Sequence, residues 1–243
     1  LSSNAQIIAP GLRVVIKGHP NKYKAPGRPS TAFAPKSSRL ARWLLIHEPR
    51  LFTQRELARA TDVDEGFTSR VIGKLLNEQL LSRNTDGLIE VPSKDLLLDA
   101  WAEEYRFDKH RLRKGHIPGR SGEEITSQLA ASLATAGVDH AFTGLAAAWR
   151  LNGFAAHRLT TVYLAGDVGL DVLAQVGFRD DARGPNTWLV LPNDEGVFHG
   201  AEVIRDIRCV HPVQAWLDLA TQPERAAEAA EAIRPSLFEE SAR

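Results

Sequence analysis

The sequence has a single cysteine, Cys209, among 243 residues. One cysteine excludes an internal disulfide and any zinc site built from several cysteines. Long hydrophobic runs are also missing: no stretch approaches the roughly 20 apolar residues that a membrane-spanning helix needs, and no secretory signal pattern opens the chain. The composition, 43% hydrophobic and 25% charged, is that of a globular protein. We therefore expect a cytoplasmic protein with no membrane partner.

Lysine is absent from residues 121–243. This excludes Schiff-base chemistry, P-loop phosphate binding and lysine-dependent nuclease chemistry from the second half. The formal net charge is zero, but residues 1–120 hold 21 Lys and Arg against 13 Asp and Glu, whereas residues 121–243 hold 9 Arg against 17 acids. The resulting charges of +8 and −8 indicate that the first half faces a polyanion and that the second half has another task.

Residues 1–36 predict a flexible basic arm, because they are rich in Pro, Gly, Lys and Ser. Only Leu12–Lys17 has the pattern of a short strand. Lys22, Lys24 and Arg28 are candidate DNA contacts in this arm. Arg28 lies in a Pro-Gly-Arg-Pro segment, whose extended backbone could place it in a narrow A·T minor groove. A leader that contacts only phosphates is the simpler alternative.

Three helices are predicted over the next 40 residues. The first covers Ser38–His47 and ends ahead of a proline. The segment Thr-Gln-Arg-Glu at 53–56 is a capping box that starts a short second helix, Gln54–Ala60. After a tight turn, Asp64 can cap a third helix that reaches about Gln79. The apolar residues of this helix recur with the period of one buried face.

A small hairpin is predicted after the third helix, because Leu80–Arg83 and Leu88–Val91 flank an Asp-Gly turn. Three helices followed by a hairpin form the outline of a winged helix-turn-helix. We assign this domain to residues 37–94. A further helix is predicted over Asp95–Phe107, followed by a basic run that ends at a Pro-Gly pair. Residues 95–120 are therefore assigned to a connecting helix and a basic linker.

The remaining residues, 121–243, alternate between strand and helix patterns. A second capping box at Ser121 opens a helix that reaches Ala136. Strands are then predicted at Val138–Phe142, Leu159–Leu164, Thr187–Leu191 and Val203–Val210, and helices at Leu145–Leu151, Gly169–Val176, Pro212–Ala220 and Glu224–Ile233. The predicted fold class is α/β (α+β), an N-terminal winged helix-turn-helix followed by a C-terminal mixed α/β domain.

The third helix carries the candidate base contacts, since the second helix of a helix-turn-helix lies in the major groove with its first residues at base edges. The periodicity leaves Phe67, Ser69 and Arg70 outside, with Lys74 one turn further. Thr68 falls on the inner face but is included among the candidates because of its position. Arginine can contact guanine O6 and N7, serine a base or phosphate, and phenylalanine a thymine methyl.

Four further residues are candidate DNA contacts. Gln54 and Arg55 start the second helix, where backbone amides and polar side chains suit phosphates. Arg83 and Asn84 lie on the predicted wing. Exposed polar residues without a function are the alternative for each of these positions taken singly.

The chain offers few parts for catalysis. Its histidines are scattered without metal-ligand spacing, and His110 is expected on a solvated linker surface. Asp167 and Asp171 follow a strand, but their spacing is helical and Asp167 is expected to cap a helix rather than hold magnesium. The acidic segment Asn193–Gly196 is expected to be a hairpin loop, with a functional acidic patch as the alternative. We expect no catalytic residue, no metal and no cofactor.

Two segments of the second half resemble a known family. Residues 141–149, AFTGLAAAW, are similar to the strand-to-helix segment of AbiEi-like antitoxins of type IV toxin–antitoxin systems. Residues 209–219, CVHPVQAWLDL, with PERA at 223–226, are similar to the closing segment of that family. The likeness extends over about residues 37–240, and the basic arm departs from the family outline.

This resemblance implies a transcriptional repressor whose N-terminal domain binds its own promoter as double-stranded DNA. It also implies that the C-terminal domain neutralises a nucleotidyltransferase-like toxin without a stable complex. Two alternatives remain: a regulator whose acidic domain senses a small ligand, and a nucleotidyltransferase-like enzyme delivered by the winged domain.

Overall fold

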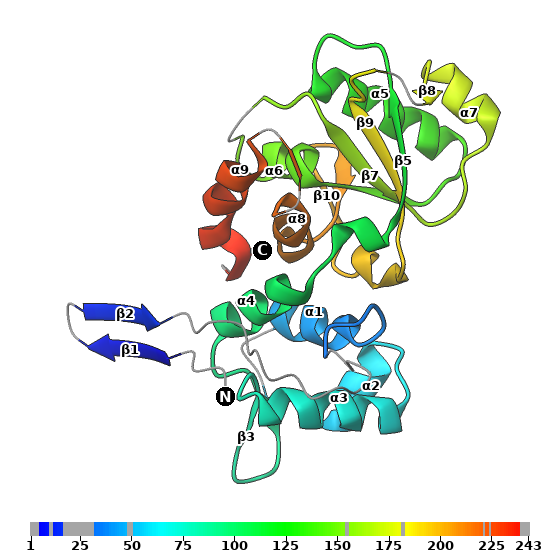
Figure 1. The fold of residues 1–243 in the computed structure, drawn as a ribbon. Helices are drawn as coiled ribbons and strands as arrows, with labels where there is room; N and C mark the ends of the chain where they lie inside the picture. Colours follow the sequence, from blue (N-terminus) through cyan, green and yellow to red (C-terminus); the bar gives the residue numbers. More distant parts are fainter. Residues whose placement is uncertain are drawn as a thin grey trace. The chain divides into compact units, whose positions relative to one another are not determined.

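The computed structural model describes residues 5–9, 12–16, 32–47, 51–153, 156–180, 183–220, 222–223 and 225–238. The chain divides into two compact units, Leu1–Ser30 and Thr31–Arg243. In the first unit, β1 (Ala5–Ala9) and β2 (Leu12–Ile16) pair antiparallel as a hairpin (Figure 1). The expected strand at Leu12–Lys17 is therefore present, whereas β1 was missed because its sequence lacks the alternation that marks a strand.

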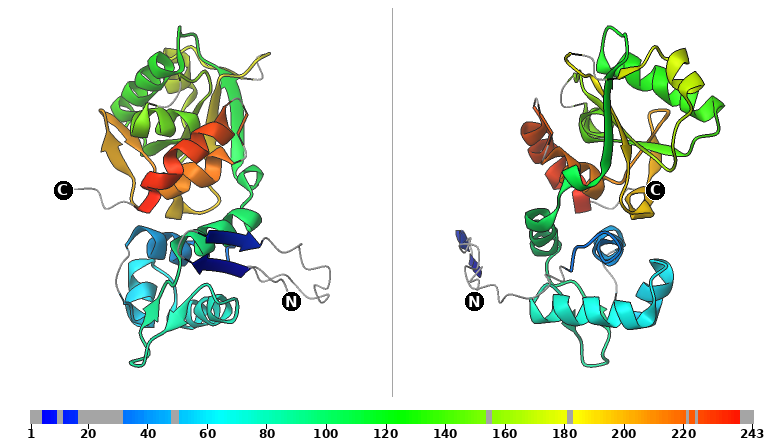
Figure 2. Two further views of the ribbon diagram at one scale, coloured as in Figure 1. Left: turned by 90° about the vertical axis from the view of Figure 1, so that its left-hand side faces the viewer. Right: turned by 45° about the vertical axis from the view of Figure 1, so that its right-hand side comes forward.

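The second unit begins with helices and a hairpin in the predicted order (Figures 1 and 2). These elements are α1 (Ser38–Ile46), α2 (Gln54–Ala60), α3 (Glu65–Asn77), β3 (Ser82–Arg83), β4 (Ile89–Glu90) and α4 (Lys94–Glu104). Strand β4 also forms a bridge through Ile89 to Phe52, ahead of α2. Leu40, Leu57 and Ile72 are buried between the helices, as the apolar periodicity of each predicted.

Seven strands of the described residues form one mixed sheet in the order β10-β11-β6-β7-β9-β5-β8. The strands are β5 (Arg111–His116), β6 (His140–Thr143), β7 (Thr160–Leu164), β8 (Arg179–Asp180), β9 (Thr187–Leu191), β10 (Glu202–Ile204) and β11 (Ile207–Cys209). The neighbours β7 and β9 are parallel, as are β11 and β6, and the other pairs are antiparallel. The predicted α/β class is confirmed.

Helices cover this sheet. They are α5 (Gly122–Thr135), α6 (Gly144–Asn152), α7 (Leu170–Gln175), α8 (Pro212–Leu219) and α9 (Ala226–Ile233), with short 3-10 turns η1 (Phe107–Lys109), η2 (Glu195–Phe198) and η3 (Arg234–Phe238). Helices α5 and α6 pack on β7, α8 packs on β6, and α9 packs on α6 and α8. Helix α1 packs on α4 and on α8, so the helical and α/β parts share one core.

The structure differs from the expected linker at Arg111–His116, which forms strand β5 between β9 and β8. Its charged side chains hid the strand pattern, and its ladder partners lie far along the chain, with Arg111 opposite Leu191. Gly115 is required here because a Cβ atom would lie 2.6 Å from the carbonyl oxygen of Arg179. The basic run is therefore part of the α/β sheet.

The single strand expected at Val203–Val210 is instead the hairpin β10–β11. Its turn residues Arg205 and Asp206 have φ angles of 47° and 67°. Both are left-handed, as a two-residue hairpin turn requires, but neither is the glycine or asparagine that usually signals such a turn. None of the helices in the described part of the chain is long and apolar enough to cross a membrane.

Candidate nucleic-acid interface

Helices α2 and α3 are fixed at their first residues by side-chain caps. Thr53 Oγ1 accepts the amide of Glu56 at 3.1 Å, and Glu56 Oε2 accepts the amide of Thr53 at 2.8 Å, which confirms the predicted capping box. Asp64 Oδ1 accepts the amide of Phe67 at 3.0 Å, as predicted for α3. Each cap satisfies amides that a helix start leaves unpaired, and together they fix where α3 begins.

One long face of α3 is open to solvent. Gly66, Ser69, Arg70 and Asn77 on this face are exposed, and Gly73 is partly so. The Arg70 guanidinium lies 5.7 Å from the centre of the half-buried Phe67 ring, a cation–π contact that orients the arginine. The two glycines beside Ser69 and Arg70 leave room for another surface to approach the helix backbone closely.

A substitution at Gly73 tests directly whether the open face of α3 is free of packing against other elements. Apart from its two chain neighbours and the backbone of its own helix, a Cβ atom built at Gly73 meets no described atom within 4 Å. We expect Gly73→Ala to raise the free energy of unfolding by about 0.5–1 kcal/mol, because alanine restricts the unfolded chain more and favours helix. Urea unfolding followed by circular dichroism measures this. A decrease in stability would contradict the solvent-exposed placement of this face.

The structure contradicts one predicted contact. Thr68 is fully buried, so its assignment to the interface is wrong and its position in the apolar periodicity was the correct signal. Lys74 is half-buried, with Nζ 3.9 Å from a Glu78 carboxylate oxygen. Ser69, Arg70 and Phe67 remain candidate contacts, since at least part of each side chain is accessible.

The candidate DNA contacts on α2 and on the hairpin also make contacts within the protein. Gln54 Nε2 donates to the backbone oxygen of Glu65 at 3.3 Å, and exposed Arg55 lies 3.3 Å from the Glu65 carboxylate. Asn84 Oδ1 accepts two amides of the hairpin turn, at 3.0 and 2.9 Å, so this side chain shapes the turn. Arg83 is exposed and donates to the Gly87 backbone oxygen at 2.7 Å.

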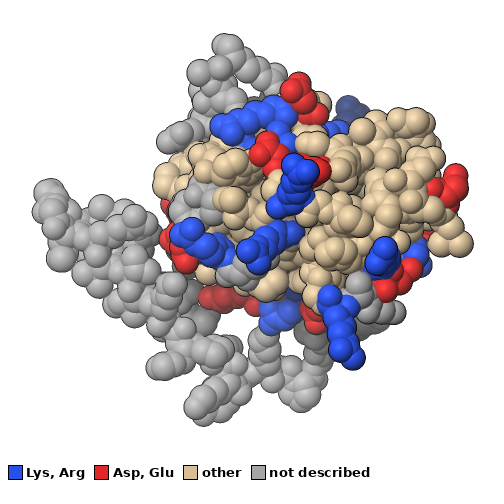
Figure 3. Space-filling view, turned by 90° about the horizontal axis from the view of Figure 1, so that it is seen from above, with Lys and Arg blue, Asp and Glu red and all other residues tan. Residues whose placement is uncertain are grey.

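Lys22, Lys24 and Arg28, the candidates in the arm, lie outside the described residues. At the end of the second unit opposite α3, positive and negative side chains are interspersed among uncharged ones (Figure 3). Two arginines of strand β5 form ion pairs: Arg111 with Asp167, with N–O at 2.6 Å, and Arg113 with Asp180, with N–O at 2.6 Å. The expectation that Asp167 caps a helix is wrong, because the N-cap of α7 is Gly169 and the Asp167 carboxylate is paired with Arg111.

A buried hydrogen-bonded group, here called the polar cluster, lies inside the α/β part and was not predicted. Its members are Tyr105, His110, Thr143, Tyr163, Gln214 and Asp218. At its centre the Asp218 carboxylate, which is 0% exposed, accepts Gln214 Nε2 at 2.8 Å and Tyr163 Oη at 3.0 Å. It also accepts hydrogen bonds from Tyr105 Oη and Thr143 Oγ1.

Thr143, Gln214 and Asp218 come from the two segments that carry the family resemblance, so distant parts of that pattern meet at one point. Burial raises the pKa of Asp218 to about 6, an increase that the four hydrogen bonds partly offset. The sequence did contain a signal for this cluster. Gln214 and Asp218 stand four residues apart on α8, and all the remaining residues from Val213 to Leu219 are apolar.

Helix α1 is attached to the α/β part through two arginines. Arg42 is 3% exposed, donates from Nη2 to Gln214 Oε1 at 2.7 Å, and lies 5.0 Å from the Trp101 ring centre. Arg39 forms a paired contact to Asp194, with Nε–Oδ1 at 2.8 Å and Nη2–Oδ2 at 2.9 Å. The segment expected to be a hairpin loop is thus a contact patch for α1.

Buried histidines predict acid sensitivity. His110, expected on a solvated surface, is buried and contacts both tyrosines of the polar cluster; burial, with Arg42 nearby, lowers its pKa to about 4. Burial also lowers the pKa of His157 and of His211 to about 4. These groups bind protons more tightly when unfolded, so the stability they contribute is lost as the pH falls from about 6.5 to 4.

Over part of this pH range the contribution of Asp218 to stability changes in the opposite direction, but the three histidines together have the larger effect. We therefore expect the free energy of unfolding to fall by about 1–3 kcal/mol per pH unit between pH 6.5 and 5. Urea titrations at several pH values measure the slope, and His157→Gln should reduce it by roughly the share of one proton. A free energy of unfolding that stays constant or rises on acidification would contradict the burial of these neutral rings.

Among the described residues, no group of three or more His, Cys, Asp and Glu side chains is placed to hold a metal ion. The remaining arrangement is a capped helix with an accessible arginine, joined through α1 to an α/β part with a buried polar centre.

A scan of family models matches residues 89–240 to the family described as transcriptional regulator, AbiEi antitoxin, type IV toxin–antitoxin system. Searches of curated proteins and of solved structures found no match. The match covers the polar cluster and most of the chain, and we conclude that this protein belongs to the AbiEi antitoxin family of transcriptional regulators.

Proposed function

We propose that this protein is a DNA-binding repressor of its own promoter and that α1–α3 with the β3–β4 hairpin act as a winged helix-turn-helix. In this proposal α3 enters the major groove, the hairpin is the wing, and the α/β part is the antitoxin domain that counteracts a nucleotidyltransferase-like toxin without a stable complex. The sequence assigns these two parts to residues 37–94 and 121–243, and we include β5 in the α/β part because it pairs with β9.

The observation that carries the proposal is the solvent-exposed face of α3. A helix of 13 residues, capped by Asp64, presents Ser69 and Arg70 between small residues and follows a shorter capped helix. Serine and arginine at this position of a recognition helix can reach base edges. The exposed Arg55 and Arg83, on α2 and the hairpin, flank α3 in sequence and supply charge for phosphates.

Fluorescence anisotropy with the protein's own upstream DNA tests the proposal. We expect tighter binding to this duplex than to a shuffled duplex of equal composition. The logarithm of the binding constant should fall linearly with the logarithm of the salt concentration, with a slope of about −0.9 per phosphate contacted. Equal affinity for both duplexes at every salt concentration would leave only a non-specific polyanion binder.

The toxin-directed part of the proposal rests on family membership alone, and a growth assay tests it. A neighbouring nucleotidyltransferase-like protein should arrest growth when expressed alone, and this protein should restore growth. Rescue by a variant that no longer binds DNA would assign the antitoxin activity to the α/β part.

A further inference from the structure

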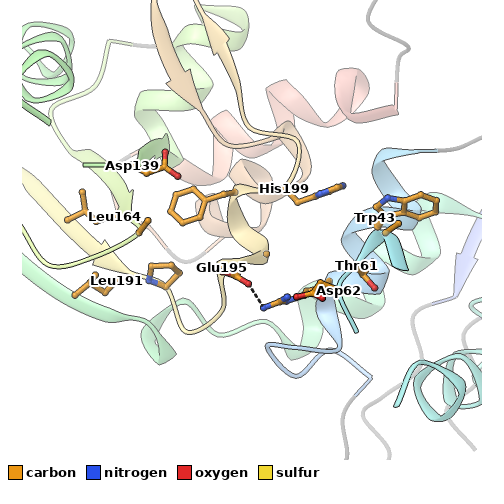
Figure 4. A pocket seen from close by; sticks show the side chains of 14 residues that line it. Trp43, Thr61, Asp62, Asp139, Leu164, Leu191, Glu195 and His199 are labelled. Carbon is orange, nitrogen blue, oxygen red and sulfur yellow. Dashed lines mark hydrogen bonds and ion pairs between the residues drawn. The ribbon is translucent and has the colours of Figure 1, made fainter. Parts of the chain in front are cut away.

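A cavity of about 500 Å³ lies where the helical part meets the ends of the central strands of the sheet (Figure 4). On the sheet side it is lined by Leu164 and Leu191, the last residues of the parallel strands β7 and β9, and by Asp139 just ahead of β6. The carboxyl end of parallel strands is where open α/β sheets most often bind ligands. The volume is within the range of small-molecule sites.

The opposite wall comes from the proposed DNA-binding part. Trp43 of α1 and the residues Thr61 and Asp62 line the cavity there. Thr61 and Asp62 form the turn between α2 and α3, and Asp62 has a φ of 50°. A molecule in this cavity would therefore touch both the turn that precedes α3 and the carboxyl ends of β7 and β9.

The polar lining is predominantly acidic. The carboxylates of Asp62, Asp139 and Glu195 face the cavity against one guanidinium, that of Arg39. Arg39 is ion-paired both with the neighbouring Asp194 and with Glu195 of the lining, where its Nη2 lies 3.2 Å from Oε1. Asp139 is ion-paired with the neighbouring Arg208. Counting these as well, four carboxylates stand against two guanidinium groups. This excess of negative charge favours a cation.

The remaining lining suits the apolar body of an organic molecule. Phe198, Leu164, Leu191 and Trp43 are apolar walls, and the Phe198 ring already carries a cation on one side, with Arg208 at 5.8 Å from its centre.

We propose that this cavity binds a small organic cation, a primary amine with an apolar body, and that its binding alters the position of α3 relative to the α/β part. The ammonium group lies beside Asp62 and Glu195, and the apolar body lies against Leu164, Leu191 and Phe198. The protein is then a regulator whose DNA affinity responds to an amine. The regulatory part rests on the proposed DNA binding, whereas binding of the amine does not require DNA and goes beyond it.

Isothermal titration calorimetry of the full chain tests the site, with tryptamine as the probe and indole-3-propionate as the same ring carrying the opposite charge. We expect tryptamine to bind and indole-3-propionate not to bind. Asp62→Asn and Glu195→Gln should each weaken tryptamine binding by about five- to tenfold, the range for one charge pair near a protein surface. Asparagine tolerates the positive φ at position 62, so this variant should fold.

Asp206→Asn is the matched control, because Asp206 is also exposed, also has a positive φ, and does not line this cavity. It should leave tryptamine binding unchanged. Three results would overturn the proposal: no heat with tryptamine at millimolar concentration, equal binding of indole-3-propionate, or equal loss in the control. Anisotropy with upstream DNA, with and without tryptamine, measures the coupling separately, and unchanged DNA affinity would overturn the regulatory part.

Discussion

Asp218→Ala is expected to lower the free energy of unfolding by about 3–5 kcal/mol, the range for removing one partner from a buried charged network. The substitution leaves Tyr105, Tyr163 and Thr143 without their common acceptor in the interior. It also removes a carboxylate whose charge favours the buried Arg42, and the link from Arg42 to the cluster passes through Gln214. Urea unfolding at pH 7, with the slope checked for two-state behaviour, measures the change.

Asp167→Ala is the matched control for this result. Asp167 also pairs with an arginine, but both side chains are largely exposed, and such pairs contribute about 0–1 kcal/mol. If the two variants lose similar stability, the polar cluster does not hold the core together. If Asp218→Ala does not fold at all, Asp218→Asn decides, because the amide preserves size and one acceptor oxygen and should lose less.

The asparagine variant also isolates a pH effect. Because the pKa of Asp218 is raised to about 6, the folded state holds this proton more tightly than the unfolded state, and this contribution to stability declines as the pH rises from about 4 to 6. Asp218→Asn lacks this decline. Its stability should therefore rise more steeply with pH over that interval than that of the unmodified protein.

Arg70→Ala is expected to weaken binding to the upstream DNA by about 1–3 kcal/mol and to relax the preference at one base pair. The side chain is exposed on α3 and oriented by the Phe67 ring, so its loss removes a contact without disturbing the core. Anisotropy with a set of duplexes, each carrying one changed base pair, measures both effects. An equal loss on every duplex would make Arg70 a phosphate contact instead.

Arg120→Ala is the control, because Arg120 is an exposed arginine in the segment that precedes α5. Figure 1 shows this segment at the end of the second unit away from α3. Its removal changes the net charge by the same amount as Arg70→Ala. If both variants lose affinity alike, the effect is one of overall charge and the proposed interface is wrong.

The limits of sequence-based inference follow from where each interaction is encoded. Local signals were sufficient for the helices: the capping box at Thr53, the cap at Asp64 and the spacing of apolar residues fixed α2 and the start of α3. These devices act within about four residues, so the sequence displays them directly. Strand β5 was missed because its ladder with β9 joins residues about 80 positions apart.

The sequence by itself determined the charge asymmetry, the order of the helices and the hairpin, and the likeness to the AbiEi antitoxins. Only the tertiary structure decided that Asp218 is buried among Thr143, Gln214 and two tyrosines and that Arg42 lies in the same core. It also decided that Thr61 and Asp62 line a cavity at the carboxyl ends of β7 and β9. The physical reason is that a side chain's pKa, partners and accessibility depend on residues brought beside it by folding, and sequence neighbours do not reveal these.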